Sequence, residues 1–250
     1  MRKIFVGFTL AEVLITLGVI GVVAAITINN LIHEYKLKTT VNSVKTAYSL
    51  LDQALKHAIN ENDSVDSWCS MSELADYDQC TKVIRDNIAK HLKTVKICNH
   101  PNNKQCWANM TESRYNSGMI LHNGMSVYIV ANNWNNVIDQ WCKIYTNSYS
   151  VPGDINALSV KGCGRIYVDI NGFKNPNKDG VDRFGFQIRR DGIVPYGFKG
   201  VHNLISFENN CVGSGNYEGT CTAWLLQYEN MDYLKCPEKL GWTKAKVCKE

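Results

Sequence analysis

The residues with the clearest capacity for chemistry are ten cysteines, none of which precedes residue 69. An even number of cysteines in a polar region is typical of disulfides formed in an oxidising compartment. Pairing each cysteine with the next along the chain is the simplest framework, although a sequence does not fix connectivity. The predicted pairs are Cys69–Cys80, Cys98–Cys106, Cys142–Cys163, Cys211–Cys221 and Cys236–Cys248. A zinc site at Cys98, His100 and Cys106 is disfavoured, because no second close pair of metal ligands follows it.

A second candidate for chemistry is the segment from Asp169 to Asp182, which is rich in Asp, Asn and Gly. Its side-chain oxygens are closely spaced, and a hard cation such as calcium takes oxygen ligands. The candidate ligands are Asp169, Asn171, Asp179 and Asp182. The spacing is not that of an EF-hand, because Gly172 comes too early and no glutamate closes the loop. Asx turns without metal are the alternative that we favour, so calcium is a candidate ion and no cofactor is required.

Charge and motifs argue against two large classes of protein. The 27 Lys and Arg against 23 Asp and Glu give a formal net charge of +4, less than nucleic-acid binding usually needs. Gly213-Ser214-Gly215 lacks the spacing of a nucleophile elbow, and His33-Glu34 lacks the second histidine of a zinc-protease helix. We therefore expect neither an enzyme nor a nucleic-acid partner.

The run from Phe8 to Ile28 is apolar over 21 residues, and its one ionisable side chain is Glu12. As a helix it would span roughly 30 Å, the thickness of the hydrocarbon core of a bilayer. Three hypotheses fit it: a secretory signal cut near Ala25, a plain anchor, or a helix retained after loss of a short leader. A carboxylate in such a span costs on the order of 2.5 to 3.5 kcal/mol, so the first two hypotheses leave Glu12 unexplained. Arg2 and Lys3 precede the run, which by the positive-inside rule directs the rest of the chain outward.

The sequence Gly7-Phe8-Thr9-Leu10-Ala11-Glu12-Val13-Leu14-Ile15 resembles the cleavage and methylation motif of type IV pilins and type II secretion pseudopilins. The resemblance implies that a prepilin peptidase cuts between Gly7 and Phe8, and that Phe8 is then N-methylated. It also implies that Glu12 guides assembly. A buried carboxylate seeks a positive partner, and the new amine of Phe8 in an adjacent subunit would supply one.

Other segments resemble the same family or depart from it. The loop 169–182 resembles a segment of pseudopilin-like proteins, some of which bind calcium nearby, and the segment from Cys221 to Leu234 resembles their tail. Val6 stands where a basic residue commonly precedes the cleavage glycine. Asn29-Asn30 stands where many relatives have a proline, so the residue that would kink the helix is missing.

Beyond the apolar run, a helical pattern continues to about residue 60. Its apolar residues recur at spacings of three and four, which predicts one apolar stripe that needs a cover. The stripe consists of Leu37, Val41, Val44, Tyr48, Leu51, Leu55 and Ala58. A sheet from the same chain is the favoured cover, and a coiled-coil partner is the alternative. A shorter helix is expected over 81–92.

Strand patterns dominate the chain after residue 115. Segments 118–122 and 125–130 flank Asn123-Gly124, a favoured hairpin turn, and segments 184–189 and 193–196 flank Asp191-Gly192. With 166–170 these predict an antiparallel sheet of four or five strands. The expected fold class is α+β and pilin-like: a long N-terminal membrane-spanning helix packed on an antiparallel sheet, with a disulfide-rich C-terminal region. Its expected segments are a leader 1–7, a span 8–28, a helical continuation 29–60 and an exported domain 61–250.

These patterns together predict a structural subunit, a pilin or pseudopilin of a type IV pilus or a type II secretion pseudopilus. Its expected partners are other pilin or pseudopilin subunits, the prepilin peptidase and methylase, and the inner membrane. The expected location is the bacterial inner membrane, as a single-pass protein whose C-terminal domain is periplasmic or extracellular. The alternative is a secreted or membrane-anchored disulfide-rich module that binds a ligand with calcium at 169–182.

Overall fold

The computed structural model describes residues 7, 9–69, 77–99, 101–109, 116–131, 162–199, 206–213 and 219–248. The chain is an α+β protein with an N-terminal apolar helix and an antiparallel six-stranded sheet, as the sequence predicts at this coarse level. It divides into two compact units, Met1–Thr39 and Thr40–Glu250. The helices are α1 (Leu10–Asn62), α2 (Tyr77–Ala89) and α3 (Thr222–Tyr228), with short turns η1 (Val65–Ser67), η2 (Asn103–Gln105), η5 (Phe207–Cys211), η6 (Asp232–Leu234) and η7 (Pro237–Lys239).

The six strands lie side by side in the order in which the chain makes them. They are β1 (Thr94–Cys98), β2 (Asn116–Leu121), β3 (Ser126–Ala131), β4 (Gly162–Asp169), β5 (Arg183–Arg189) and β6 (Ile193–Pro195). Both predicted hairpins are present: Gly124, at φ 86°, closes the turn between β2 and β3, and the Arg189 N–H bonds to the Gly192 carbonyl, 2.8 Å away, between β5 and β6. The prediction of four or five strands is too low by at least one, because it contains no strand over β1.

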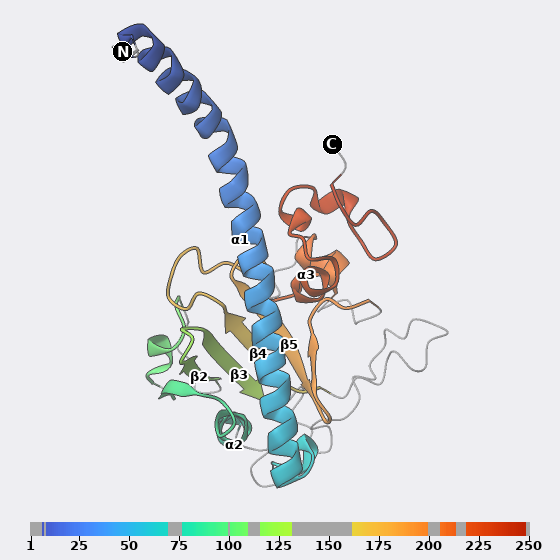
Figure 1. Cartoon of the computed structure of the whole chain (residues 1–250). Coiled ribbons are helices and arrows are strands. Elements are labelled where there is room, and N and C mark those ends of the chain that lie inside the picture. Colours follow the sequence, from blue (N-terminus) through green and yellow to red (C-terminus); the bar gives the residue numbers. More distant parts are fainter. Residues whose placement is uncertain are drawn as a thin grey trace. The chain divides into compact units, whose positions relative to one another are not determined.

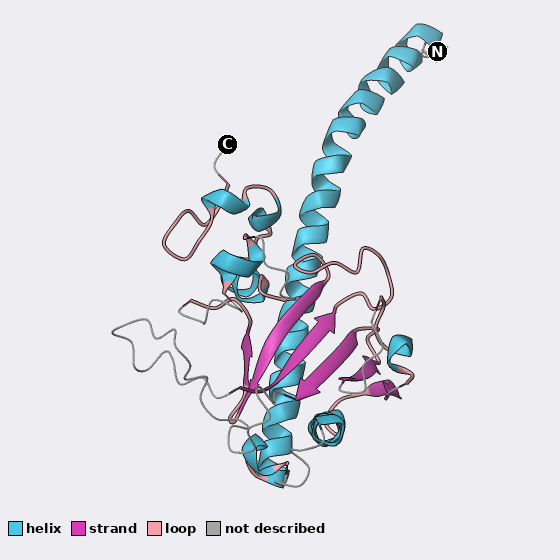
Figure 2. Cartoon of the chain, turned by 180° about the vertical axis from the view of Figure 1, so that it is seen from behind, coloured by secondary structure: helices cyan, strands magenta, loops and turns pink. Residues whose placement is uncertain are grey.

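Strand register separates the two faces of the sheet. Val127 pairs with Val168 and Val168 with Phe184, while Ile129 pairs with Ile166 and Ile166 with Phe186, so these apolar residues share one face. The second half of α1, from residue 40, crosses this face (Figure 1), and Tyr48 stacks on Phe186 with ring centroids 5.9 Å apart. Figure 2 shows the sheet from its other side.

The predicted stripe of α1 is buried from residue 40 onward, and the cover is the sheet of the same chain. Val44 and Leu55 are fully buried, Tyr48 is half-buried, and Ala47 and Ala54 widen the buried face. The prediction that a sheet rather than a coiled-coil partner covers the stripe is therefore confirmed for this part of the helix. The helix ends at Asn62, close to the predicted end.

Helix α2 packs beside β2 and β3, and it begins four residues earlier and ends three residues earlier than predicted. Ile84 and Ile88 supply its buried face. The Thr81 hydroxyl accepts a hydrogen bond from the Ala131 N–H at 3.0 Å, which ties the helix to the end of β3.

The C-terminal segment folds around aromatic side chains rather than around strands. Trp224, on α3, is fully buried and stacks on Phe207 with ring centroids 4.1 Å apart. Leu225 is also buried, as expected for a core residue. Leu234 is exposed and does not belong to this core.

Candidate functional site

Glu12 forms a capping box with Thr9 at the start of α1. The Glu12 carboxylate accepts hydrogen bonds from the backbone N–H and the hydroxyl of Thr9, both at 2.8 Å, through the same oxygen. In return the Glu12 N–H donates to the Thr9 hydroxyl at 3.3 Å. Thr9 is thus the N-cap and Glu12 the third helical residue, the pairing that satisfies two backbone donors at once. The acidic group also lies at the positive end of the helix dipole.

The sequence interpretation missed Thr9. The signal was present, because a Thr three residues before a Glu and just ahead of an apolar run is the signature of a capping box. Gly7, the residue before the predicted cut, is exposed and its backbone is open, with no atom near the position of an added side chain. Phe8, the predicted site of methylation, lies outside the described residues.

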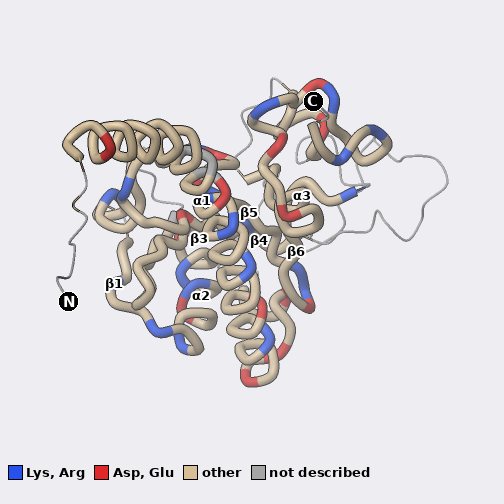
Figure 3. The backbone as a smooth tube through the Cα atoms, turned by 45° about the horizontal axis from the view of Figure 1, so that its top comes forward, with Lys and Arg blue, Asp and Glu red and all other residues tan. Residues whose placement is uncertain are grey.

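The apolar part of α1 has the length and composition of a membrane span. Leu10 to Ile28 has a mean hydropathy of 2.3, and none of its most apolar window is buried, unlike the core helix of a soluble protein. By length and composition this helix fits a membrane span or a signal sequence. Figure 3 shows how few charged residues this stretch carries.

The hydroxyls within this stretch are satisfied by their own helix. Thr16 donates to the Val13 carbonyl at 2.9 Å, and Thr27 donates to the Val23 carbonyl at 2.9 Å. Together with the capping box, these bonds give each of the described polar side chains from Thr9 to Thr27 a partner inside the chain. A lipid environment requires such internal partners, because it offers no water to replace them.

Four of the five predicted disulfides are present in the described part of the chain. Their Cα–Cα separations lie between 5.0 and 6.0 Å. The bonds are Cys69–Cys80, Cys98–Cys106, Cys211–Cys221 and Cys236–Cys248. Cys163 is also disulfide-bonded, and its predicted partner Cys142 lies outside the described residues.

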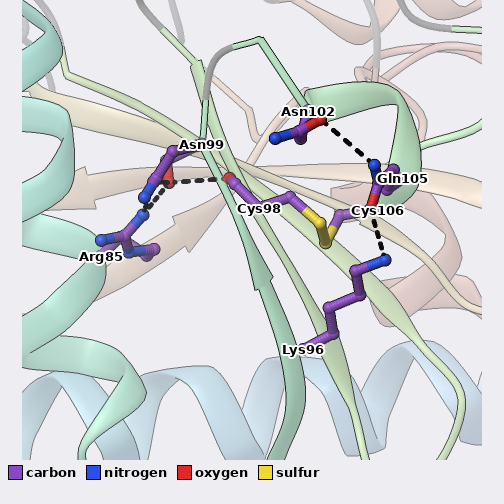
Figure 4. The surroundings of a disulfide bond; sticks show 8 residues. Arg85, Lys96, Cys98, Asn99, Asn102, Gln105 and Cys106 are labelled. Atoms are coloured by element: carbon purple, nitrogen blue, oxygen red, sulfur yellow. Dashed lines mark hydrogen bonds between the residues drawn. A yellow bond between two sulfur atoms is a disulfide. The ribbon is translucent and has the colours of Figure 1, made fainter.

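The Cys98–Cys106 bond contradicts the alternative of a zinc site at these cysteines, because a bonded sulfur is not a thiolate ligand. It joins the end of β1 to the turn η2, and polar contacts flank it on both sides (Figure 4). On one side the Arg85 guanidinium donates to the Asn99 side chain. On the other, Lys96 donates to Gln105 at 2.6 Å.

The acidic loop between β4 and β5 brings Asp169, Asn171 and Asp182 together, but uses their oxygens internally. Asp182 accepts hydrogen bonds from the backbone N–H groups of Asn177 and Lys178, at 2.8 and 2.5 Å, and from the Asn171 amide at 3.2 Å. Asp169 accepts one from the Asn171 N–H at 3.3 Å, which is an Asx turn. Asp179 is exposed and pairs with Arg183 through a backbone bridge, away from this carboxylate arrangement.

The positive charge beside Asp169 comes from the guanidinium of Arg183, which takes the position that a bound metal ion would need. Arg183 Nε lies 3.2 Å from Asp169 Oδ2, Arg183 also donates to the Ala108 carbonyl at 2.6 Å, and its guanidinium sits over Trp107, 4.9 Å from the ring centroid. Burial raises the pKa of Asp169 to about 6, and the hydrogen bond from Arg183 limits that rise.

These contacts do not offer a calcium ion a shared set of free ligands. Asn171 Oδ1 is buried without a hydrogen-bond partner, and one such oxygen falls short of the roughly six to eight that calcium takes. Within the described ranges, no three His, Cys, Asp or Glu side chains are grouped as metal ligands. The Asx-turn alternative accounts for the observed bonds, and calcium binding stays a prediction.

The chain matches no protein-family model, and comparisons with curated proteins and with solved structures find no significant match. A function must therefore be argued from the residues and their geometry.

Proposed function

We propose that this chain is a structural subunit of a membrane-assembled filament, a pilin or pseudopilin of a type IV pilus or type II secretion pseudopilus. The observation that carries the proposal is the motif from Gly7 to Glu12, placed at the start of an exposed helix long and apolar enough to cross a bilayer. A pilin-like fold is part of this proposal. The support for it is a helix that packs through its second half on an antiparallel sheet.

The proposed mechanism is polymerisation of helices that leave lipid for a filament core. Removal of the leader 1–7 by a prepilin peptidase would create an amine on Phe8, one helical turn from Glu12. In a single chain, Thr9 donates two hydrogen bonds to one oxygen of the Glu12 carboxylate but leaves its charge unneutralised. The amine of an adjacent subunit would neutralise it, and this pairing would fix the axial register between subunits.

The disulfides support export of the region after the span to the periplasm or the cell surface. Arg2 and Lys3 precede the span, but Lys36 and Lys38 follow it within ten residues and Lys45 within twenty, so the sequence beyond the span carries at least as many basic residues. The charge bias therefore orients the helix weakly. Disulfide bonds persist mainly in oxidising compartments, so they carry the assignment of the bacterial inner membrane with an exported C-terminal domain.

The proposal is tested by replacing Glu12 and scoring two outcomes separately, retention in the membrane and incorporation into filaments. We expect Glu12→Ala and Glu12→Leu to be retained, since both make the span more apolar. We expect incorporation to fall at least tenfold, since a loss of about 1.4 kcal/mol in subunit pairing suffices. Glu61→Ala, which removes an exposed carboxylate from the far end of the same helix, should assemble like the unmodified chain.

Wild-type incorporation of both Glu12 variants would show that the carboxylate has no role in assembly. The intact mass of the protein from its native host separates the remaining hypotheses. A chain that begins with methylated Phe8 supports the filament subunit. A chain that begins near Ile26 supports the alternative, a secreted disulfide-rich module.

A further inference from the structure

After Asn29 and Asn30, which follow the predicted span, α1 carries two further apolar residues. Leu31 and Ile32 are exposed by 69% and 46%, although the hydropathy window ends at Ile28. From Leu10 to Ile32 the helix rises about 33 Å, slightly more than the roughly 30 Å of a bilayer hydrocarbon core. Ile32 therefore marks the level at which the helix would leave the hydrocarbon.

The residues that follow Ile32 change character within one turn. Tyr35 is 69% exposed, and Lys36 and Lys38 are both exposed. Neither lysine makes an ion pair within the part of the chain that the structure describes. Glu34 is exposed in the same turn and reduces the local balance to one positive charge.

The helix geometry places these side chains at the depth of the lipid headgroups. Tyr35, Lys36 and Lys38 lie about 4.5, 6 and 9 Å beyond Ile32 along the helix, and the headgroup region of one leaflet is about 5 to 7 Å thick, so Lys38 reaches it only through its long side chain. Helical side chains lean toward the N-terminus, so the long lysine stems would lean back toward the membrane surface. Tyr35 has the amphipathic ring that favours this interface.

We infer that Tyr35, Lys36 and Lys38 form a headgroup anchor that binds anionic phospholipids of the leaflet on the exported side. This inference rests on the membrane insertion of α1 proposed above. The ammonium groups recognise the phosphate, and Tyr35 holds the helix at the interface. The anchor sets the depth of the helix in the membrane before assembly. Its contacts with lipid phosphates must break when a subunit moves into a filament.

The test uses the full-length protein in nanodiscs of equal phosphatidylcholine and phosphatidylglycerol. Native mass spectrometry measures which lipids remain bound after the protein is released. We expect the unmodified chain to retain phosphatidylglycerol preferentially, and the double variant Lys36→Gln/Lys38→Gln to lose about fivefold or more of that preference. Lys90→Gln/Lys93→Gln makes the same change of charge at exposed positions outside the anchor and should keep it. Glu34→Gln should increase the preference for phosphatidylglycerol, because it removes the negative charge next to the two lysines.

Two results would overturn the anchor: an unchanged preference in Lys36→Gln/Lys38→Gln, or an equal loss in Lys90→Gln/Lys93→Gln. A second experiment distinguishes failure of the anchor from failure of the proposed function. It treats native membranes that contain the unmodified chain with alkaline carbonate, which releases proteins that are not inserted in the bilayer. Release of the chain would refute membrane insertion and the anchor with it. Retention in the membrane without preference for phosphatidylglycerol would refute the anchor alone.

Discussion

Glu12 is the residue on which the proposed function depends, and the structure gives it a partner within its own chain, Thr9. Thr9 donates through both its N–H and its hydroxyl, which lowers the cost of placing a carboxylate near lipid. Neutral donors leave the charge in place, so a cation still gains more from the carboxylate than Thr9 does. The capping box thus lowers the free-energy cost of Glu12 in the isolated helix. The pairing of Glu12 with an amine of an adjacent subunit would still be the stronger interaction.

Asp169 is the residue for which a pH dependence is expected. Burial raises its pKa from 3.8 to about 6, so the folded chain binds a proton that the unfolded chain releases between these values. The stability that this group contributes is therefore fully present below pH 3.8 and is lost as the pH rises through about 6. We expect Asp169→Asn, which keeps an oxygen for Arg183, to unfold with a flatter pH dependence between pH 4 and 7.

Carboxyl chemical shifts measured by NMR locate this titration directly. A midpoint near pH 6 for Asp169 agrees with the expectation, whereas a midpoint near 4 would mean that Arg183 offsets the effect of burial. The sequence placed Asp169 at the start of a turn-rich loop, and in the structure it is the last residue of β4. It could not show that Arg183 folds back onto the carboxylate, because that contact depends on the pairing of β4 with β5.

At the scale of elements, the sequence correctly predicted the helix and the hairpins whose residues follow a clear repeating or turn pattern. The α1 stripe and both hairpins follow from spacings of three and four and from Asn-Gly and Asp-Gly turns. Strand β1 was missed because its alternation of apolar Val95 and Ile97 with polar Lys96 covers too few residues to predict a strand by itself. Its place at the edge of the sheet depends on pairing with β2, which these residues alone do not reveal.

The docking of α2 is expected to depend on Arg85, a cation that is only 4% exposed. Its guanidinium donates to Asn99, to Ser117 on β2 and to Asp86, so one side chain joins the helix to two neighbouring segments. Arg85→Ala would remove these bonds and leave the buried Ser117 hydroxyl without this donor, and we expect the free energy of unfolding to fall by about 2 kcal/mol.

Lys82→Ala is the matched control for Arg85→Ala, because Lys82 also lies on α2 and pairs with an acid, Asp78, at 2.6 Å. That pair lies near the surface and should contribute about 0.5 kcal/mol or less. Urea unfolding measures both changes. Equal effects of the two substitutions would show that the Arg85 contacts do not fasten α2 to the sheet.

At the scale of the whole molecule, the disulfides could be predicted because each described bond joins cysteines that are close in the sequence. The four described bonds join cysteines 8 to 12 residues apart, so pairing neighbours in sequence gave the right partners. Composition could not give the aromatic packing of the C-terminal segment, since Phe207 and Trp224 meet only after the chain turns back. The division into two units at Thr39 and Thr40 was likewise hidden, because α1 runs through it as one helix.

This division predicts that residues 40–250 fold without the apolar segment. The buried stripe of α1 begins at Val41, so a chain starting at Thr40 keeps every core contact of the helix. A chain starting at Tyr48 loses Val41, Val44 and Ala47, whose burial contributes on the order of 3 to 6 kcal/mol, a large part of the roughly 5 to 15 kcal/mol that stabilises a domain. We expect the longer fragment, made in an oxidising compartment, to be soluble, free of reactive thiols and cooperative in urea, and the shorter one to unfold at clearly lower urea. Equal midpoints would show that α1 contributes little to the core, and aggregation of the longer fragment would show that the globular unit needs residues before Thr40.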